Sequence, residues 1–181
     1  MSIADLWLPI LVSAVVCFVM SAVIWMAFKY HNSDYKQTND EEAVRAALKG
    51  NKPGFFLLPY CMDQAELKKP EVKQKYDDGP LAYITMLPNG LPSMGPRLIG
   101  MFVYFLVVGV LCAYFVTFAV APDADYLAVF RVAGTVAFIA NSFALVPESV
   151  WFGRPWRMTA KNFIDAVIYS LLTGGVFGWL I

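Results

Sequence analysis

Two long stretches without a charged side chain constrain this sequence more than any other feature. Leu6 to Phe28 and Leu98 to Ala121 contain no aspartate, glutamate, lysine or arginine. Each is longer than the roughly 20 residues that a helix needs to cross about 30 Å of hydrocarbon. Charged residues make up 15% of the whole chain, whereas soluble domains carry about 25%. Both stretches therefore predict transmembrane helices.

Two less apolar runs follow in the second half of the chain. Tyr126 to Pro147 is interrupted by Arg131 and Asn141, and Phe163 to Ile181 is interrupted by Asp165. The apolar runs are continuous rather than alternating, which argues against a transmembrane β-barrel. We therefore expect an all-α integral membrane protein with four transmembrane helices. The predicted helices cover residues 1–29, about 98–121, about 126–147 and about 163–181.

Lysine and arginine residues near the membrane boundary predict the orientation, because they are enriched in cytoplasmic loops. Lys29 and Arg97 flank the long loop, and Arg154, Arg157 and Lys161 lie between the third and fourth predicted helices. The connection "APDADY" between the second and third helices has no basic residue. We expect both termini outside and residues 30–97 as a cytoplasmic loop.

The first apolar segment differs from a cleavable signal peptide. A signal peptide begins with a positively charged region, whereas the residues before this segment, "MSIAD", contain no lysine or arginine. We therefore expect the segment to be retained as a transmembrane helix.

The long loop has the pattern of a small folded cap on the membrane surface. Helix-start signals occur at Thr38 with Glu41 and at Asp63 with Glu66, and Pro70 suits the first turn of a further helix. The runs "GFFLLPY" and "PLAYITMLPNG" are short, apolar and bounded by glycine or proline, which is typical of strands. We expect short helices and a two-stranded ribbon.

An aromatic and basic stretch, "WFGRPWR", separates the third and fourth predicted helices. Tryptophan is enriched at the membrane–water boundary, and basic side chains there contact lipid phosphates. The pattern predicts an interface with lipid; a specific phospholipid or a partner subunit is the alternative. The predicted interface residues are Trp151, Arg154, Trp156, Arg157 and Lys161.

Polar residues within the predicted membrane helices are functional candidates, because they are costly to bury there. Arg131 is expected to extend toward Asp123 and Asp125, or else to bind a ligand or a partner carboxylate. Asp165, three residues after Asn162, is expected to cap the start of the fourth helix.

Glu148 has two possible roles. It lies close in sequence to Arg154 and Arg157, which favours an ion-pair cluster at the interface. The alternative is a proton or cation site that Glu148 shares with Asn141.

Small residues at four-residue spacing predict close helix packing. Gly174 and Gly178 form one such pair in the fourth predicted helix, and Ala133 and Ala137 form another in the third. Packing of these two helices against each other is the simplest expectation; packing against another protein is the alternative.

The sequence shows no catalytic or cofactor-binding motif, so we predict no catalytic residue and no cofactor. His31 and Cys61 are weak candidates for a metal site, because such sites generally need two or more spaced Cys or His pairs. The formal net charge is zero, which gives no electrostatic basis for binding nucleic acid.

The runs "IADLWLPILVSAVVCFVMSAVIWM", "MGPRL" and "YLAVFRVAGTVAFIANSFALVPESVWFGRPW" resemble a family of small bacterial four-helix inner-membrane proteins. That family has no known activity, so the resemblance implies only a location in a bacterial inner membrane.

Three functions remain open at this point. The first is an accessory or scaffold protein that contacts membrane lipids and other membrane subunits or its own copies. The second is a small oligomeric transporter or channel that uses Glu148, Asn141 and Arg131. The third is metal or redox handling through His31 and Cys61.

Overall fold

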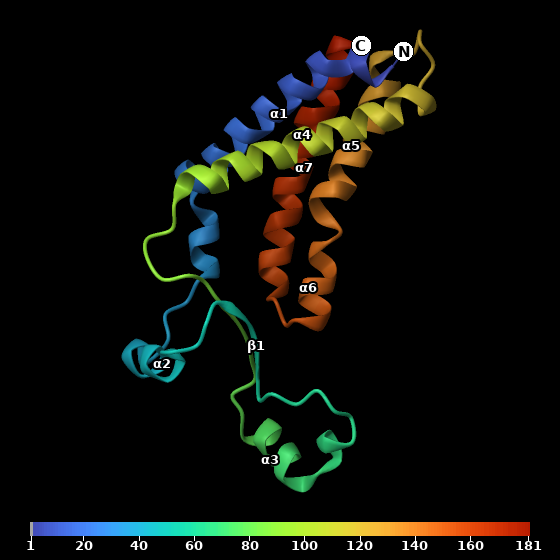
Figure 1. Ribbon diagram of the computed structural model, residues 1–181. Coiled ribbons are helices and arrows are strands. Elements are labelled where there is room, and N and C mark those ends of the chain that lie inside the picture. The colour runs from blue at the N-terminus through green and yellow to red at the C-terminus, as the bar shows by residue number, and fades with distance from the viewer. Residues whose placement is uncertain (1) are drawn as a thin grey trace. The chain divides into compact units, whose positions relative to one another are not determined.

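Four helical spans in the computed structural model are long and apolar enough to cross a membrane (Figure 1). The structure describes residues 2–181. The prediction of a mostly helical chain with four helices long and apolar enough to span a membrane, together with a small two-stranded sheet, is confirmed. The four spans are Ile3–Phe28, Met94–Ala119, Tyr126–Trp151 and Trp156–Leu180.

The helices and strands occur in the following order along the chain. The α-helices are α1 (Trp7–Ala22), α2 (Glu41–Leu48), α3 (Pro70–Asp78), α4 (Met94–Ala119), α5 (Tyr126–Ser142), α6 (Leu145–Trp151) and α7 (Trp156–Leu180). The strands are β1 (Gly54–Leu58) and β2 (Ala82–Met86). Short 3₁₀ turns cover Ile3–Leu6, Tyr30–Asp34 and Glu66–Lys68, and a π-helical segment covers Val23–Phe28.

The chain divides into two units. Residues 2–36 and 93–181 form the helical unit, and residues 37–92 form the second unit. The predicted loop spans residues 30–97, but its first seven residues belong to the helical unit. That difference matters, because these residues build the polar site described below.

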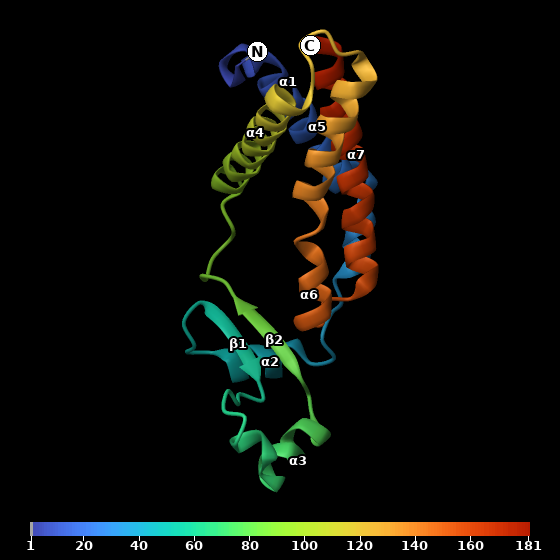
Figure 2. The ribbon, with the colours of Figure 1, turned by 90° about the vertical axis from the view of Figure 1, so that its right-hand side faces the viewer.

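In the helical unit, each long helix contacts two others. α1 packs against α4 and α7, and α5 packs against α4 and α7. The N-terminus and the C-terminus lie at the same end of this unit (Figures 1 and 2). The buried core is apolar and fills the space between the helices, with Phe105, Cys112, Val129 and Phe177 among its members.

The tightest helix contact joins α5 and α7, because glycine there allows the two backbones to approach closely. A Cβ atom added at Gly174 would lie 2.8 Å from the carbonyl oxygen of Phe130 and 3.2 Å from the Cα atom of Gly134. One added at Gly178 would lie 2.8 Å from the ring of Tyr126. Ala133 is fully buried in the same region.

The third span is broken into α5 and α6 where the sequence predicts one helix to Pro147. Proline lacks an N–H, and its ring collides with the carbonyl four residues earlier. For Pro147 that carbonyl belongs to Phe143, and the helix breaks at Phe143 and Ala144. α6 then runs to Trp151, four residues beyond the predicted end.

A glycine turn joins α6 to α7. The Arg154 N–H donates to the Glu148 carbonyl at 3.2 Å, and Gly153 between them has φ +66°. A glycine in the left-handed conformation directly after a helix is a common way to end it. α7 begins at Trp156, seven residues before the start that the apolar run predicts, so Lys161 and Asp165 lie well inside the helix.

The second unit is built on the antiparallel pairing of β1 with β2, which are joined by a long segment that contains α3. The register places Phe56 opposite Ile84. The Asp40 carboxylate caps α2 by accepting from Ala43 N–H at 2.9 Å, so the predicted capping role of Thr38 is wrong. No residue in 37–92 is buried, as the small size of this unit leads one to expect.

Replacing Gly174 with alanine is expected to destabilise the helical unit by roughly 1–3 kcal/mol, because the new methyl group overlaps the Phe130 carbonyl oxygen. The thermal unfolding midpoint in detergent, followed by circular dichroism, measures this effect. Gly100→Ala in α4 is the matched control, since a Cβ there meets no atom within 4 Å. Equal midpoints for the two variants would contradict the close α5–α7 contact.

Candidate functional site

The most extensive polar site in the helical unit lies where the chain leaves the first span. The π-helical segment closes with a hydrogen bond from Lys29 N–H to the Ile24 carbonyl at 3.2 Å. Lys29 itself adopts a left-handed conformation with φ 52°, which is uncommon for a residue with a side chain. The Tyr30–Asp34 turn follows at once and contacts α7.

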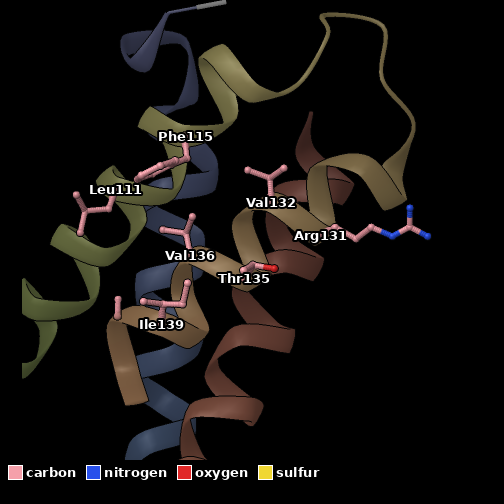
Figure 3. Close-up of a pocket in the computed structure, with 8 residues that line it drawn as sticks. Leu111, Phe115, Arg131, Val132, Thr135, Val136 and Ile139 are labelled. Atoms are coloured by element: carbon pink, nitrogen blue, oxygen red, sulfur yellow. The ribbon is translucent and has the colours of Figure 1, made fainter. Parts of the chain in front are cut away.

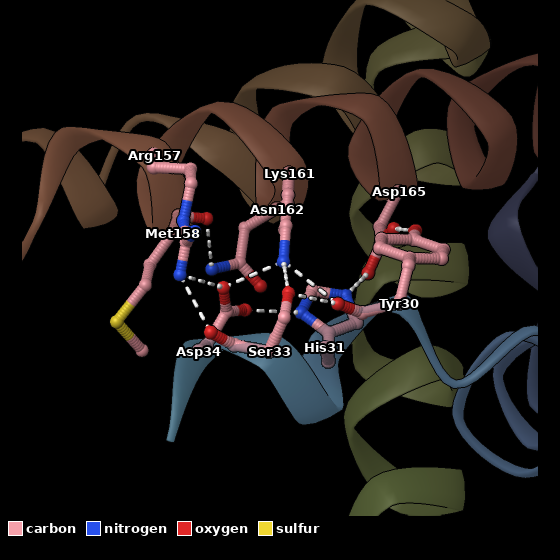
Figure 4. A network of polar contacts seen from close by, with 9 residues as sticks. All are labelled: Tyr30, His31, Ser33, Asp34, Arg157, Met158, Lys161, Asn162 and Asp165. Atoms are coloured by element: carbon pink, nitrogen blue, oxygen red, sulfur yellow. Dashed lines mark hydrogen bonds and ion pairs between the residues drawn. The ribbon is translucent and has the colours of Figure 1, made fainter. Parts of the chain in front are cut away.

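Side chains from this turn and from α7 form a connected network, here named the His31 cluster (Figure 4). Its three members on α7 are Arg157, Lys161 and Asp165. They are spaced four residues apart and therefore lie on one face of the helix. The members of the cluster are Tyr30, His31, Ser33, Asp34, Arg157, Lys161 and Asp165.

His31 lies at the centre of the cluster and is 2% exposed. Its Nε2 atom is 2.9 Å from Asp165 Oδ2, and its Nδ1 atom is 3.1 Å from Asp34 Oδ2. Trp25 stacks on the imidazole with ring centroids 4.2 Å apart. Each ring nitrogen of His31 therefore lies within hydrogen-bond distance of a carboxylate oxygen.

Asp165 is buried and uses both carboxylate oxygens. One accepts from the Tyr30 hydroxyl, and the other faces His31. The expectation that Asp165 caps the fourth helix is wrong, because the helix begins at Trp156 and Asp165 lies nine residues further on. Asn162, its expected capping partner, donates instead to the Met158 carbonyl.

Lys161 connects the whole turn to α7. Its ammonium group donates to Asp34 Oδ1 at 2.6 Å, to the Tyr30 carbonyl at 2.7 Å and to Ser33 Oγ at 2.8 Å. These contacts use all three of its donors. Arg157 adds a hydrogen bond to the Ser33 carbonyl at 2.5 Å and lies 3.7 Å from Asp34 Oδ1.

The hydrogen bond from Lys161 lowers the pKa of the Asp34 carboxyl group below its ordinary value, and the bond to His31 acts in the same direction. The side chain of Asp34 is 2% exposed. A carboxylate removed from water needs such partners, and removing one of them leaves the charge uncompensated. The ion pairs and hydrogen bonds of the cluster therefore hold the Tyr30–Asp34 turn against α7.

The predicted pairing of Glu148 with arginine is not found. Within residues 2–181, no ion pair joins Glu148 to Arg154 or Arg157, and Arg157 contacts Asp34 instead. Glu148 is exposed, as are Trp151 and Trp156.

Asn141 connects two helices instead of facing Glu148. Its amide donates to the Ala137 carbonyl at 2.7 Å, and its oxygen accepts from the Tyr104 hydroxyl of α4 at 3.2 Å. The break after α5 separates Asn141 from Glu148.

Arg131 lies on the exposed side of α5. No ion pair within residues 2–181 joins it to Asp123 or Asp125, and the Asp125 carboxylate caps α5 by accepting from Ala128 N–H. The stem of Arg131 lines an apolar groove between α4 and α5.

The two weak metal candidates belong to different units. Both ring nitrogens of His31 face carboxylates, and Cys61 Sγ lies 3.6 Å from the Asp63 carbonyl oxygen. Among residues 2–181, no group of three or more His, Cys, Asp or Glu side chains is arranged to hold a metal ion.

A row of small polar residues along α1, not singled out in the sequence, is buried, and its middle member contacts α7. Ser13, Cys17 and Ser21 are buried and spaced four residues apart. Cys17 Sγ lies 3.4 Å from the Thr173 hydroxyl and 3.6 Å from the Tyr169 carbonyl oxygen. The four-residue spacing is the sequence signal that indicates this contact face.

Comparisons with protein-family models, with curated proteins and with solved structures find no match to this chain. The functional interpretation below therefore depends on the geometry of the helical unit.

Replacing Asp34 with asparagine is expected to lower the thermal midpoint at pH 7. The pKa of Asp34 in the folded protein lies below the ordinary aspartate value of about 3.9. At pH values well above that ordinary value, the charge contacts of Asp34 therefore make their whole contribution to stability. It is lost as the pH falls through the lowered pKa. The difference in midpoint between wild type and Asp34→Asn should therefore shrink on acidification.

Asp123→Asn is the control for this measurement, because Asp123 is exposed and outside the cluster. A difference between wild type and Asp34→Asn that stays constant from neutral to strongly acidic pH would contradict the charge contacts assigned to Asp34.

Proposed function

We propose that this chain is an integral membrane accessory or scaffold protein of a bacterial inner membrane, a subunit or organiser of a larger assembly. Its partners are membrane lipids together with other membrane subunits or further copies of the chain. The proposal assigns no catalytic step to any residue.

The observation that carries the proposal is the way the His31 cluster uses its ionisable groups. Asp34 and Lys161 pair with each other, and Asp165 contacts His31 and the Tyr30 hydroxyl, so the polar side-chain atoms of all three are engaged with the Tyr30–Asp34 turn or with α7. Groups used in this way fix the position of a chain segment on a helix. That is the behaviour of a structural scaffold, in which positional order matters more than access to a substrate.

The surface of the helical unit supports the same proposal. Trp151 and Trp156 are exposed near the α6–α7 turn, beside the half-exposed Arg154. This combination suits lipid headgroups at a membrane boundary. With the basic residues at that end in the cytoplasm, the orientation is N-out and C-out, and residues 37–92 are cytoplasmic.

Purification from native membranes tests this function. The tagged chain is solubilised in two mild detergents, and the recovered proteins are quantified by mass spectrometry. An accessory subunit recovers at least one larger membrane protein at the same fixed ratio in both detergents. A tagged, unrelated four-helix membrane protein controls for nonspecific recovery. Recovery of the chain alone, or only as a homo-oligomer, would overturn the subunit assignment.

A further inference from the structure

A lateral groove of about 670 Å³ runs between α4 and α5 on the outside of the helical unit (Figure 3). Its walls are almost entirely hydrocarbon, with one hydroxyl and one cation at its margin. The residues that line it are Leu111, Phe115, Arg131, Val132, Thr135, Val136, Ile139 and Ala140.

Most of the side chains that line this groove are branched or aromatic. Leu111, Phe115 and Ile139 are all exposed and are drawn in Figure 3 along the opening between the two helices. Both helices belong to spans that are long and apolar enough to cross a membrane, and the groove faces hydrocarbon rather than water when they do.

A flexible acyl chain suits these walls better than a partner helix does. Helices pack in membranes through small residues that allow the backbones to approach closely. The small residues Ala133, Ala137 and Gly134 of α5 are already turned toward the interior or α7. Among the eight residues that line the groove, Ala140 is the only small apolar one.

Arg131 supplies the polar end of the groove. It lies five residues after the start of α5, about 7–8 Å along the helix axis from that end. A helical side chain leans toward the N-terminus of its helix, here toward the membrane boundary. The stem lines the groove while the guanidinium points away from the apolar walls (Figure 3).

The Arg131 guanidinium has no ion-pair partner within residues 2–181. A cation near the hydrocarbon boundary is stabilised when an anion pairs with it. A guanidinium and a phosphate form paired, charge-assisted hydrogen bonds, which are stronger than neutral ones.

We propose that the groove binds one phospholipid molecule, with an acyl chain along Leu111, Phe115 and Ile139 and the phosphate at Arg131. The site differs from the tryptophan and arginine interface at the α6–α7 turn, because it lies near the other end of the bundle and combines chain and headgroup contacts. It depends on neither the His31 cluster nor the accessory function.

Native mass spectrometry of the full chain in detergent tests this site with two probes. Phosphatidylglycerol and diacylglycerol with the same acyl chains differ by the phosphate headgroup. Wild type should retain one copy of phosphatidylglycerol about tenfold more strongly than diacylglycerol, as one charge-assisted contact predicts.

Two variants separate the headgroup contact from the chain contact. Arg131→Gln should remove the preference for the phosphate-bearing lipid, whereas Arg97→Gln, an exposed arginine on α4, should keep it. Ile139→Trp fills the groove and should lower retention of both lipids. Ile164→Trp is its matched control, because Ile164 is similarly exposed on α7.

Unchanged preference in Arg131→Gln would overturn the phosphate contact. Unchanged retention in Ile139→Trp, with its circular dichroism spectrum intact, would overturn the groove as the lipid site. A lipid-free dimer in wild type that Ile139→Trp dissociates would show that a second copy covers the groove, which also overturns the proposal.

Discussion

The burial of His31 between two carboxylates is the interaction on which the arrangement of the first and fourth spans depends. Asp34 and Asp165 come from segments that are far apart in sequence, and the imidazole contacts both. Charges in a poorly hydrated place are tolerated when they are paired and hydrogen-bonded. The cluster meets this condition through Lys161 and the Tyr30 hydroxyl. It thereby fixes where the chain leaves the helical unit, directly before the second unit begins at Gln37.

The remaining helix contacts follow from a different physical requirement. Between apolar helices in lipid, the gain comes from close packing rather than from exclusion of water. The α5–α7 contact meets this through Gly134 and Gly174, and α1 packs closely on α4 at Gly109. Polar contacts such as Tyr104 with Asn141 add specificity to the α4–α5 pair. Along the groove between α4 and α5, the side chains of the two helices leave a gap in this close packing.

The four spans could be predicted from sequence because the requirement is simple. A helix that crosses hydrocarbon needs about 20 apolar residues and leaves a continuous run. The two strands could also be predicted from the sequence, because each is a short apolar run between glycine or proline residues. The start of α7 was missed because Arg157 and Lys161 were assigned to a membrane-surface loop, whereas they lie in its first two turns.

The His31 cluster could not be predicted, for a physical reason. It requires the π-helical segment and the left-handed Lys29 to direct the chain onto α7, and neither follows from local residue preferences. One signal was present in the sequence: Arg157, Lys161 and Asp165 are spaced four residues apart and share a helix face. Their partners, however, are more than 120 residues away in the chain, and only the tertiary structure identifies them.

The most direct test of this account is nitrogen NMR of the histidine side chain, because the chain has a single histidine. With ¹⁵N-labelled histidine, the account predicts that the signals of both ring nitrogens report hydrogen bonds. It also predicts that Asp165→Asn shifts chiefly the Nε2 signal and Asp34→Asn chiefly the Nδ1 signal. Ring-nitrogen signals that neither substitution shifts would contradict the central role of His31.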